Sequence, residues 1–139
     1  MIKRLKLPLG RAQIILYPPM GQGTSNEEGL FALCSVEEFD LLITGDADAF
    51  VERMLVKYQP LPDLELLMVG HHGSAGSTDP VLLDRLRPEL AIISVGHNSY
   101  GHPAQEVLDR LAETGAQVWR TDQSGSITVT VQDELVSIH

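Results

Sequence analysis

Four short polar segments, each placed directly after an apolar run, contain the histidine and aspartate residues that could do chemistry. They are Thr44-Gly45-Asp46, Gly70-His71-His72-Gly73-Ser74, residues 96–103 and residues 120–125. Imidazole and carboxylate groups are ligands of zinc and similar divalent metals, which keep open positions for water. The segments therefore predict a metal site, with Asp46, His71 and His72 as its candidate ligands.

Each of these signals has a structural alternative when it is taken alone. Asp46 precedes an expected helix, so its carboxylate could cap that helix. His71 and His72 are adjacent, and adjacent strand residues point to opposite faces, so one could be a core residue and the other a surface residue. His102, before Pro103, could simply start a helix. A helix N-terminus also favours phosphate, which makes His102 a candidate for the substrate side of a site.

Two other chemistries fit the sequence poorly. Ser74 lacks the leading glycine of a nucleophile elbow and lies beyond the sharp strand–helix turn that such a serine needs. Gly21-Gln22-Gly23 lacks the third glycine and the following helix of a dinucleotide fingerprint, and there is no Walker lysine. The sequence therefore disfavours a serine hydrolase and a nucleotide-binding fold.

An alternation of strands and helices must position the polar segments. From residue 39 the pattern predicts strands over 39–44, 64–69, 90–95 and 117–120, and helices over 47–58, 79–87 and 103–114. The carboxyl ends of parallel strands share one edge of a sheet, where ligands bind. We therefore expect the four polar segments to meet at that edge.

Capping residues and apolar spacing support the three helices. Asp79-Pro80 is expected to open the second helix, His102-Pro103 to open the third, and Gly115 to close the third. The first helix is expected to bury one apolar stripe. This stripe consists of Phe50, Met54 and Tyr58, with Val51 and Leu55 beside them.

The two ends of the chain have the pattern of antiparallel β structure. Strands are predicted over 11–17, 29–36 and 38–44, an irregular loop over 17–26, and a closing hairpin after Gly125. The predicted fold is α/β, with a mixed sheet and three main helices. At 139 residues the chain is expected to form a single domain over 1–139.

Composition restricts the classes of function. Ten Lys and Arg against nineteen Asp and Glu give a net charge of −9. This balance disfavours broad nucleic-acid binding, which needs clustered basic residues, so a phosphate substrate would require local donors or metal. The single cysteine, Cys34, excludes an internal disulfide. No apolar run is long enough to cross a bilayer, so we expect a soluble chain.

The motifs over residues 11–131 resemble the C-terminal half of the metallo-β-lactamase-like domain of ComEC-type competence proteins, the DNA-uptake channels. His-His-Gly-Ser followed by Gly-His-Pro and Arg-Thr-Asp is the most specific part of the likeness. The motifs are residues 42–47, residues 69–74 with Ser77, residues 93–96 with Asn98, Tyr100 and Gly101-His102-Pro103, and Arg120-Thr121-Asp122 with Gly125.

The resemblance implies a fold and a set of site residues. The family fold is an αββα sandwich of two similar halves, so this chain would be half of one, without its N-terminal half. Asp46 matches an aspartate that bridges two metals, His71 or His72 a late histidine ligand, and His102 a histidine on the substrate side. Asp46 and His102 are therefore the candidate catalytic residues. The candidate substrate-binding residues are Ser74, Asn98 and His102.

The resemblance also implies partners and a location. The family's early His-x-His-x-Asp-His motif is missing, since no histidine precedes His71. We expect zinc or manganese in the complete domain, and a chain that is inactive alone. The expected partners are the remainder of a longer parent protein, a second copy of the chain and, through the parent, single-stranded DNA. The implied location is the extracytoplasmic side of a bacterial membrane, as a soluble fragment of a membrane protein.

The implied function is hydrolysis of phosphodiesters, such as the DNA strand discarded during uptake. One alternative is a non-catalytic docking or structural module that retains the fold. Another is a parent that cleaves a small ester or lactam, which these residues do not distinguish from a nuclease.

Overall fold

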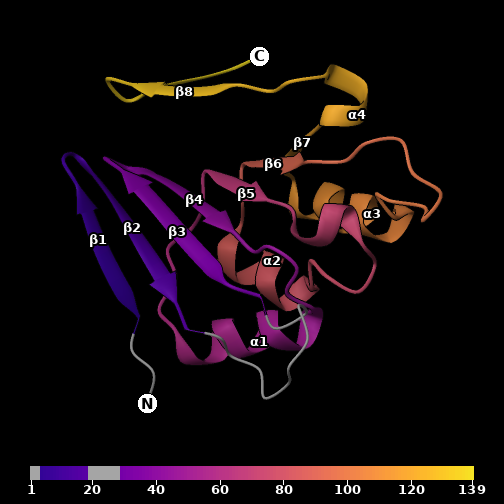
Figure 1. Cartoon of the computed structure of the whole chain (residues 1–139), viewed down its shortest axis with the longest axis horizontal. Helices are drawn as coiled ribbons and strands as arrows, with labels where there is room; N and C mark the ends of the chain where they lie inside the picture. Colours follow the sequence, from indigo (N-terminus) through magenta and orange to yellow (C-terminus); the bar gives the residue numbers. More distant parts are fainter. Residues whose placement is uncertain (1–3, 19–28) are drawn as a thin grey trace.

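A seven-stranded mixed sheet forms the centre of the computed structural model, which describes residues 4–18 and 29–139 (Figure 1). Its strands, in spatial and sequence order, are β1 (Leu5–Leu9), β2 (Ala12–Tyr17), β3 (Phe31–Val36), β4 (Phe39–Ile43), β5 (Leu66–Met68), β6 (Leu90–Ile93) and β7 (Gln117–Arg120). Strands β1 to β4 pair antiparallel and strands β4 to β7 pair parallel. The predicted mixed sheet is therefore confirmed.

Helices α1 (Ala49–Tyr58), α2 (Pro80–Leu86) and α3 (Gln105–Thr114) cover one face of this sheet (Figure 1). Leu33, Leu42, Leu67 and Ala91 are in register across strands β3 to β6. They share one buried cluster with apolar side chains of all three helices. This cluster is the main core, and it fixes the helices relative to the carboxyl ends of the parallel strands.

A hairpin of β8 (Val129–Gln132) and β9 (Leu135–Ile138) lies on the opposite side of the sheet, away from the three helices (Figure 1). Val129, Val131 and Ile138 pack against a second buried cluster that contains Leu66 and Ile92. This confirms the predicted closing hairpin. Because both faces of β5 and β6 are covered, these strands can be continuously apolar.

Several expected helix signals are confirmed. The Asp79 carboxylate caps α2 by accepting the N–H of Val81 at 3.0 Å, and Pro80 is the first helical residue. Gly115, at φ 87°, ends α3 in the left-handed conformation. In the part of the chain that is described, no helix is long and apolar enough to span a bilayer.

The starts of α1 and α3 differ from the prediction. Helix α1 begins at Ala49, and its cap is Asp48, whose carboxylate accepts the N–H of Val51 at 2.9 Å. Helix α3 begins at Gln105 rather than at His102-Pro103, because hydrogen bonds hold His102 in the preceding loop.

The predicted stripe on α1 is confirmed for Val51 and Leu55 and was wrong for Phe50 and Tyr58. Phe50 and Tyr58 are each 57% exposed, whereas Val51 and Leu55 are buried. Both sets have the spacing of one helical face, and packing against the core selects the second.

The predicted strand boundaries were incomplete at the N-terminus. Strand β1 was not predicted, because Pro8 weakens the strand signal that Leu5, Leu7 and Leu9 give by their alternation; all five residues of the strand are exposed. The predicted loop over 17–26 lies outside the described residues from position 19 onward.

Candidate functional site

Backbone hydrogen bonds join the loops that follow β4, β5 and β6. The N–H of His71 donates to the Gly45 carbonyl at 2.8 Å, and the N–H of Ala104 donates to the Gly73 carbonyl at 2.9 Å. The loops are also packed tightly, because a Cβ at Gly73 would lie 2.6 Å from the Pro103 Cβ. The segments that carry Asp46, the His71-His72 pair and His102 therefore meet at one edge of the sheet.

His71 and His72 form a strained turn. They lie in η2 (Gly70–Gly73), with φ of 50° and 54°, and Gly73 follows with φ 83°. The left-handed conformation disfavours residues with a Cβ by about 1–2 kcal/mol each. Strain of this kind persists only where the surroundings enforce it, and it is concentrated at functional sites. Two successive left-handed histidines therefore mark this turn as the centre of the candidate site.

We expect His71→Gly to raise the free energy of unfolding by about 0.5–1 kcal/mol, because glycine adopts this conformation without strain. His97→Gly is the matched control, since His97 is exposed and has no positive φ. The control should be neutral or lower stability by up to about 1 kcal/mol. Urea unfolding measures both, and a destabilised His71→Gly variant beside a neutral control would contradict the strain.

The His72 ring is oriented by a backbone carbonyl. Its Nδ1 lies 2.6 Å from the Ser94 oxygen, and because a carbonyl only accepts, Nδ1 must carry the proton. In the neutral form of this exposed imidazole, the lone pair is then on Nε2. Histidines that bind metals commonly have this arrangement, in which one nitrogen donates to a carbonyl and the other binds.

His71 and His102 lie beside each other. Their ring centroids are 6.1 Å apart in an edge-on arrangement, and the Tyr100 ring lies 6.0 Å from that of His102. His102 is partly buried, whereas Tyr100 is 83% exposed. The structure thus brings His102 to the strained turn and places an exposed aromatic ring near it.

Asn98 shapes the loop around His102. Its Nδ2 donates to the carbonyls of Gly96 at 3.0 Å and His102 at 2.8 Å, and its Oδ1 accepts the N–H groups of Tyr100 and His102. These four bonds occupy the whole amide. Asn98 is therefore placed to hold His102 rather than to offer free groups.

Ser74 contributes to the neighbouring loop in a similar way. Its hydroxyl accepts the N–H of Gly76 at 3.3 Å, and its own N–H donates to the His71 carbonyl. Both contacts help to close the turn that follows the histidine pair.

Asp46 is exposed at the same edge of the sheet. Asp48 caps α1, so the cap that was the structural alternative for Asp46 is not formed. Among the described residues, the Asp46 carboxylate has no hydrogen bond or ion pair. It is available to bind a ligand.

The fourth loop forms an ion pair. Arg120 donates to Asp122 through Nε at 3.0 Å and Nη2 at 2.7 Å. The hydrogen bond from Arg120 lowers the pKa of Asp122. Thr121 accepts the N–H of Val95 at 2.8 Å and starts α4 (Thr121–Ser124), so this loop supports the end of β6.

The candidate ligands do not form a complete metal site by themselves. Within residues 4–18 and 29–139, no group of three or more His, Cys, Asp or Glu side chains is arranged to hold a metal ion. A metal ion usually needs about three protein ligands. The described residues offer separate donors at one edge, and further donors would have to come from elsewhere.

Glu52 was missed by the sequence reasoning. Its side chain is wholly buried on α1, where Oε1 accepts the N–H of Thr78 at 2.9 Å and Oε2 that of Asp79 at 2.8 Å. Burial raises its pKa to about 7, although the two N–H groups oppose this shift. Its place between Val51 and Leu55 could have signalled burial only if the packed face of α1 had been identified.

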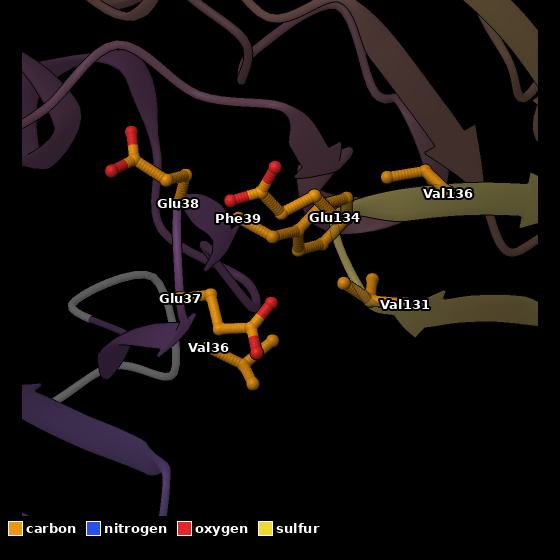
Figure 2. Close-up of a pocket in the computed structure, with 7 residues that line it drawn as sticks. All are labelled: Val36, Glu37, Glu38, Phe39, Val131, Glu134 and Val136. Atoms are coloured by element: carbon orange, nitrogen blue, oxygen red, sulfur yellow. The ribbon is translucent and has the colours of Figure 1, made fainter.

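A separate pocket of about 300 Å³ lies between the β3–β4 turn and the β8–β9 hairpin (Figure 2). Its lining residues are Val36, Glu37, Glu38, Phe39, Val131, Glu134 and Val136. It adjoins the start of β4, whereas the Asp46 loop follows the end of that strand. The pocket is therefore separate from the histidine loops.

The curated proteins that match part of the chain include three at 40–42% identity. ComE operon protein 3 of Bacillus subtilis (strain 168) is 42% identical over 87 residues, competence protein ComA of Neisseria gonorrhoeae 42% over 89, and recombination protein 2 of Haemophilus influenzae 40% over 97. The matches cover 62%, 63% and 68% of this chain. They span only 11%, 13% and 12% of the relatives' own lengths. No protein-family model matches the chain.

Proposed function

Because the chain is homologous to one segment of the ComEC-type competence proteins, we propose that it supplies one part of a metal-dependent hydrolase site that acts on phosphodiesters. The observation that carries this proposal is the strained His71-His72 turn at the meeting point of three strand-end loops. The exposed Asp46 carboxylate and the oriented His72 ring supply donors of the types that zinc and manganese accept. Further ligands would come from a part of the parent protein outside this chain.

The chain's own residues have distinct roles in this proposal. Asp46 and one of His71 and His72 bind metal, whose chemistry when bound is to activate water and polarise the phosphoryl group. His102, held by Asn98 beside the histidine turn, contacts the phosphodiester. The net charge of −9 makes such local contacts necessary for an anionic substrate.

We also propose that the sheet and its three helices are one half of an αββα sandwich. The hairpin covers only part of the second sheet face, and an apolar cavity of about 290 Å³ lies between it and strands β1 to β5. A second half, or a second copy of this chain, would cover the remainder. In the parent protein this domain would lie on the extracytoplasmic side of a bacterial membrane.

We expect the isolated 139-residue chain to bind zinc or manganese weakly, at one ion or fewer per chain, and to lack hydrolase activity. The reason is that the described residues hold no three-ligand group. Missing outer groups that orient ligands weaken metal binding by a further ~10–100-fold. Calorimetric titration tests this, and two ions bound per chain at micromolar or tighter affinity would contradict it.

One alternative function is a non-catalytic docking or structural module. The incomplete set of metal ligands in the described residues favours it. The sequence encoded upstream of Met1 distinguishes the two functions, because a catalytic parent needs an early histidine motif there. If that motif is absent, the docking module is the correct interpretation.

A further inference from the structure

The loop over residues 70–79, which we call the histidine loop, is anchored at both ends. At its start, the N–H of His71 donates to the carbonyl of Gly45, in the loop that carries Asp46. At its end, the N–H groups of Thr78 and Asp79 donate to the buried carboxylate of Glu52. A displacement of the second anchor would therefore be transmitted to the histidines through only a few residues.

The second anchor holds a strained residue. Thr78 is β-branched and buried, yet its φ is 59°, a conformation that such residues rarely adopt. Its hydroxyl has no hydrogen-bond partner among the described residues. Its N–H donates to Glu52 Oε1 at 2.9 Å, and its carbonyl accepts a longer bond from Arg110 at 3.5 Å, so the Glu52 bond is the shorter of the two polar contacts that keep Thr78 in place.

Two acceptor oxygens are needed at this position. Each carboxylate oxygen of Glu52 accepts one N–H, and both N–H groups are buried. A glutamine would satisfy one of them and turn an N–H donor toward the other. A buried acid is unfavourable in a core unless its polar atoms are hydrogen-bonded, and here both oxygens of Glu52 are used as acceptors.

Two further hydrogen bonds join the start of α1 to the histidine loop. The N–H of Ala49 donates to the Gly76 carbonyl at 2.8 Å, and the Ser77 hydroxyl donates to the Ala47 carbonyl at 2.7 Å. Asp46 lies three residues before the first residue of this helix. The start of α1 is therefore a shared frame for the Asp46 loop and the histidine loop.

We propose that Glu52 is a positioning residue, which fixes the histidine loop against α1 and so sets His71 and His72 relative to Asp46. The catalytic importance of this role rests on the proposed function. The positioning itself does not, and it is tested without any measurement of activity.

The test compares Glu52→Gln with Glu113→Gln in the full 139-residue chain, since Glu113 is exposed on α3. At pH 8, and at a temperature where both variants are folded, NMR measures amide hydrogen exchange in the histidine loop and the tautomer of His72. We expect Glu52→Gln to accelerate exchange there by about tenfold or more and to release His72 from its Nδ1–H form. Glu113→Gln should change neither.

A folded Glu52→Gln variant with wild-type exchange and an unchanged His72 tautomer would overturn the proposal. A variant that is only less stable should keep the wild-type tautomer of His72 at temperatures below its melting temperature. A lower melting temperature alone therefore does not support the proposal. If Glu52→Gln does not fold, amide hydrogen exchange of the wild-type chain is measured instead. The Thr78 and Asp79 amide protons should then be protected at least about tenfold relative to unstructured amides, and unprotected amides at both positions would overturn the proposal.

Discussion

Replacement of Glu52 by alanine is expected to lower the free energy of unfolding by about 4 kcal/mol at pH 5. The substitution leaves the buried N–H groups of Thr78 and Asp79 without acceptors, at about 1–3 kcal/mol each. It also removes buried methylene groups, each of which contributes about 0.8 kcal/mol. Urea unfolding followed by circular dichroism measures the difference from the wild-type chain.

The effect of this substitution should depend on pH, with a definite sign. The pKa of Glu52 is raised from 4.5 to about 7 in the folded state, so the folded chain holds a proton that the unfolded chain releases between these values. The stabilisation is complete below about pH 4.5 and is lost as the pH rises through 7. The difference between wild type and Glu52→Ala should therefore shrink by about 3 kcal/mol between pH 5 and 8.

Exposed Glu113 provides the matched control for this measurement. Glu113→Ala should change stability by less than about 0.5 kcal/mol at every pH. A loss for Glu52→Ala that is constant from pH 5 to 8 would contradict the raised pKa. A loss no larger than that of the control would show that the two hydrogen bonds do not stabilise the fold.

Replacement of Asp46 by alanine should abolish metal-dependent hydrolysis in the full-length parent protein, with a fall of at least about 100-fold. In our proposal Asp46 is a direct metal ligand, and loss even of groups that only orient ligands reduces activity ~10–100-fold. Its carboxylate is exposed and makes no hydrogen bond or ion pair with the described residues, so stability should change by less than about 0.5 kcal/mol.

Asp48, two residues further along, should behave in the opposite way. Its carboxylate caps α1, so Asp48→Ala should lower stability by about 1 kcal/mol and leave most of the activity intact. Rates of oligonucleotide cleavage and unfolding curves, measured for both variants, distinguish the role of metal ligand from the role of helix cap. Wild-type cleavage by Asp46→Ala would contradict the assignment of Asp46 as a ligand.

Local chemistry explains which parts of the fold could be predicted. The strand and helix alternation after residue 39 follows from apolar runs bounded by turn residues, and Asp79-Pro80 and Gly115 act through their own backbone preferences. The buried side of α1 could not be predicted, because Phe50 with Met54 and Val51 with Leu55 have the same spacing. Only the core selects between them.

The sequence indicated which residues lie near one another in the candidate site, but it did not indicate their detailed arrangement. The rule that parallel strands end at one edge indicated that Asp46, the histidine pair and His102 belong together. The left-handed turn at His71 and His72 has no sequence signal, because residues with a Cβ avoid this conformation. Similarly, the part played by Glu52 depends on N–H groups 26 and 27 residues away in the sequence.

Cleavage of a labelled single-stranded oligonucleotide by the full-length parent protein tests the central claim most directly. The protein is stripped with a chelator and assayed before and after addition of manganese or zinc, beside the 139-residue chain at the same concentration. We predict that the full-length protein cleaves only when metal is restored, and that the chain alone does not cleave. A folded full-length protein that leaves the oligonucleotide intact with either metal would contradict the claim that these loops are part of a metal-dependent phosphodiesterase site.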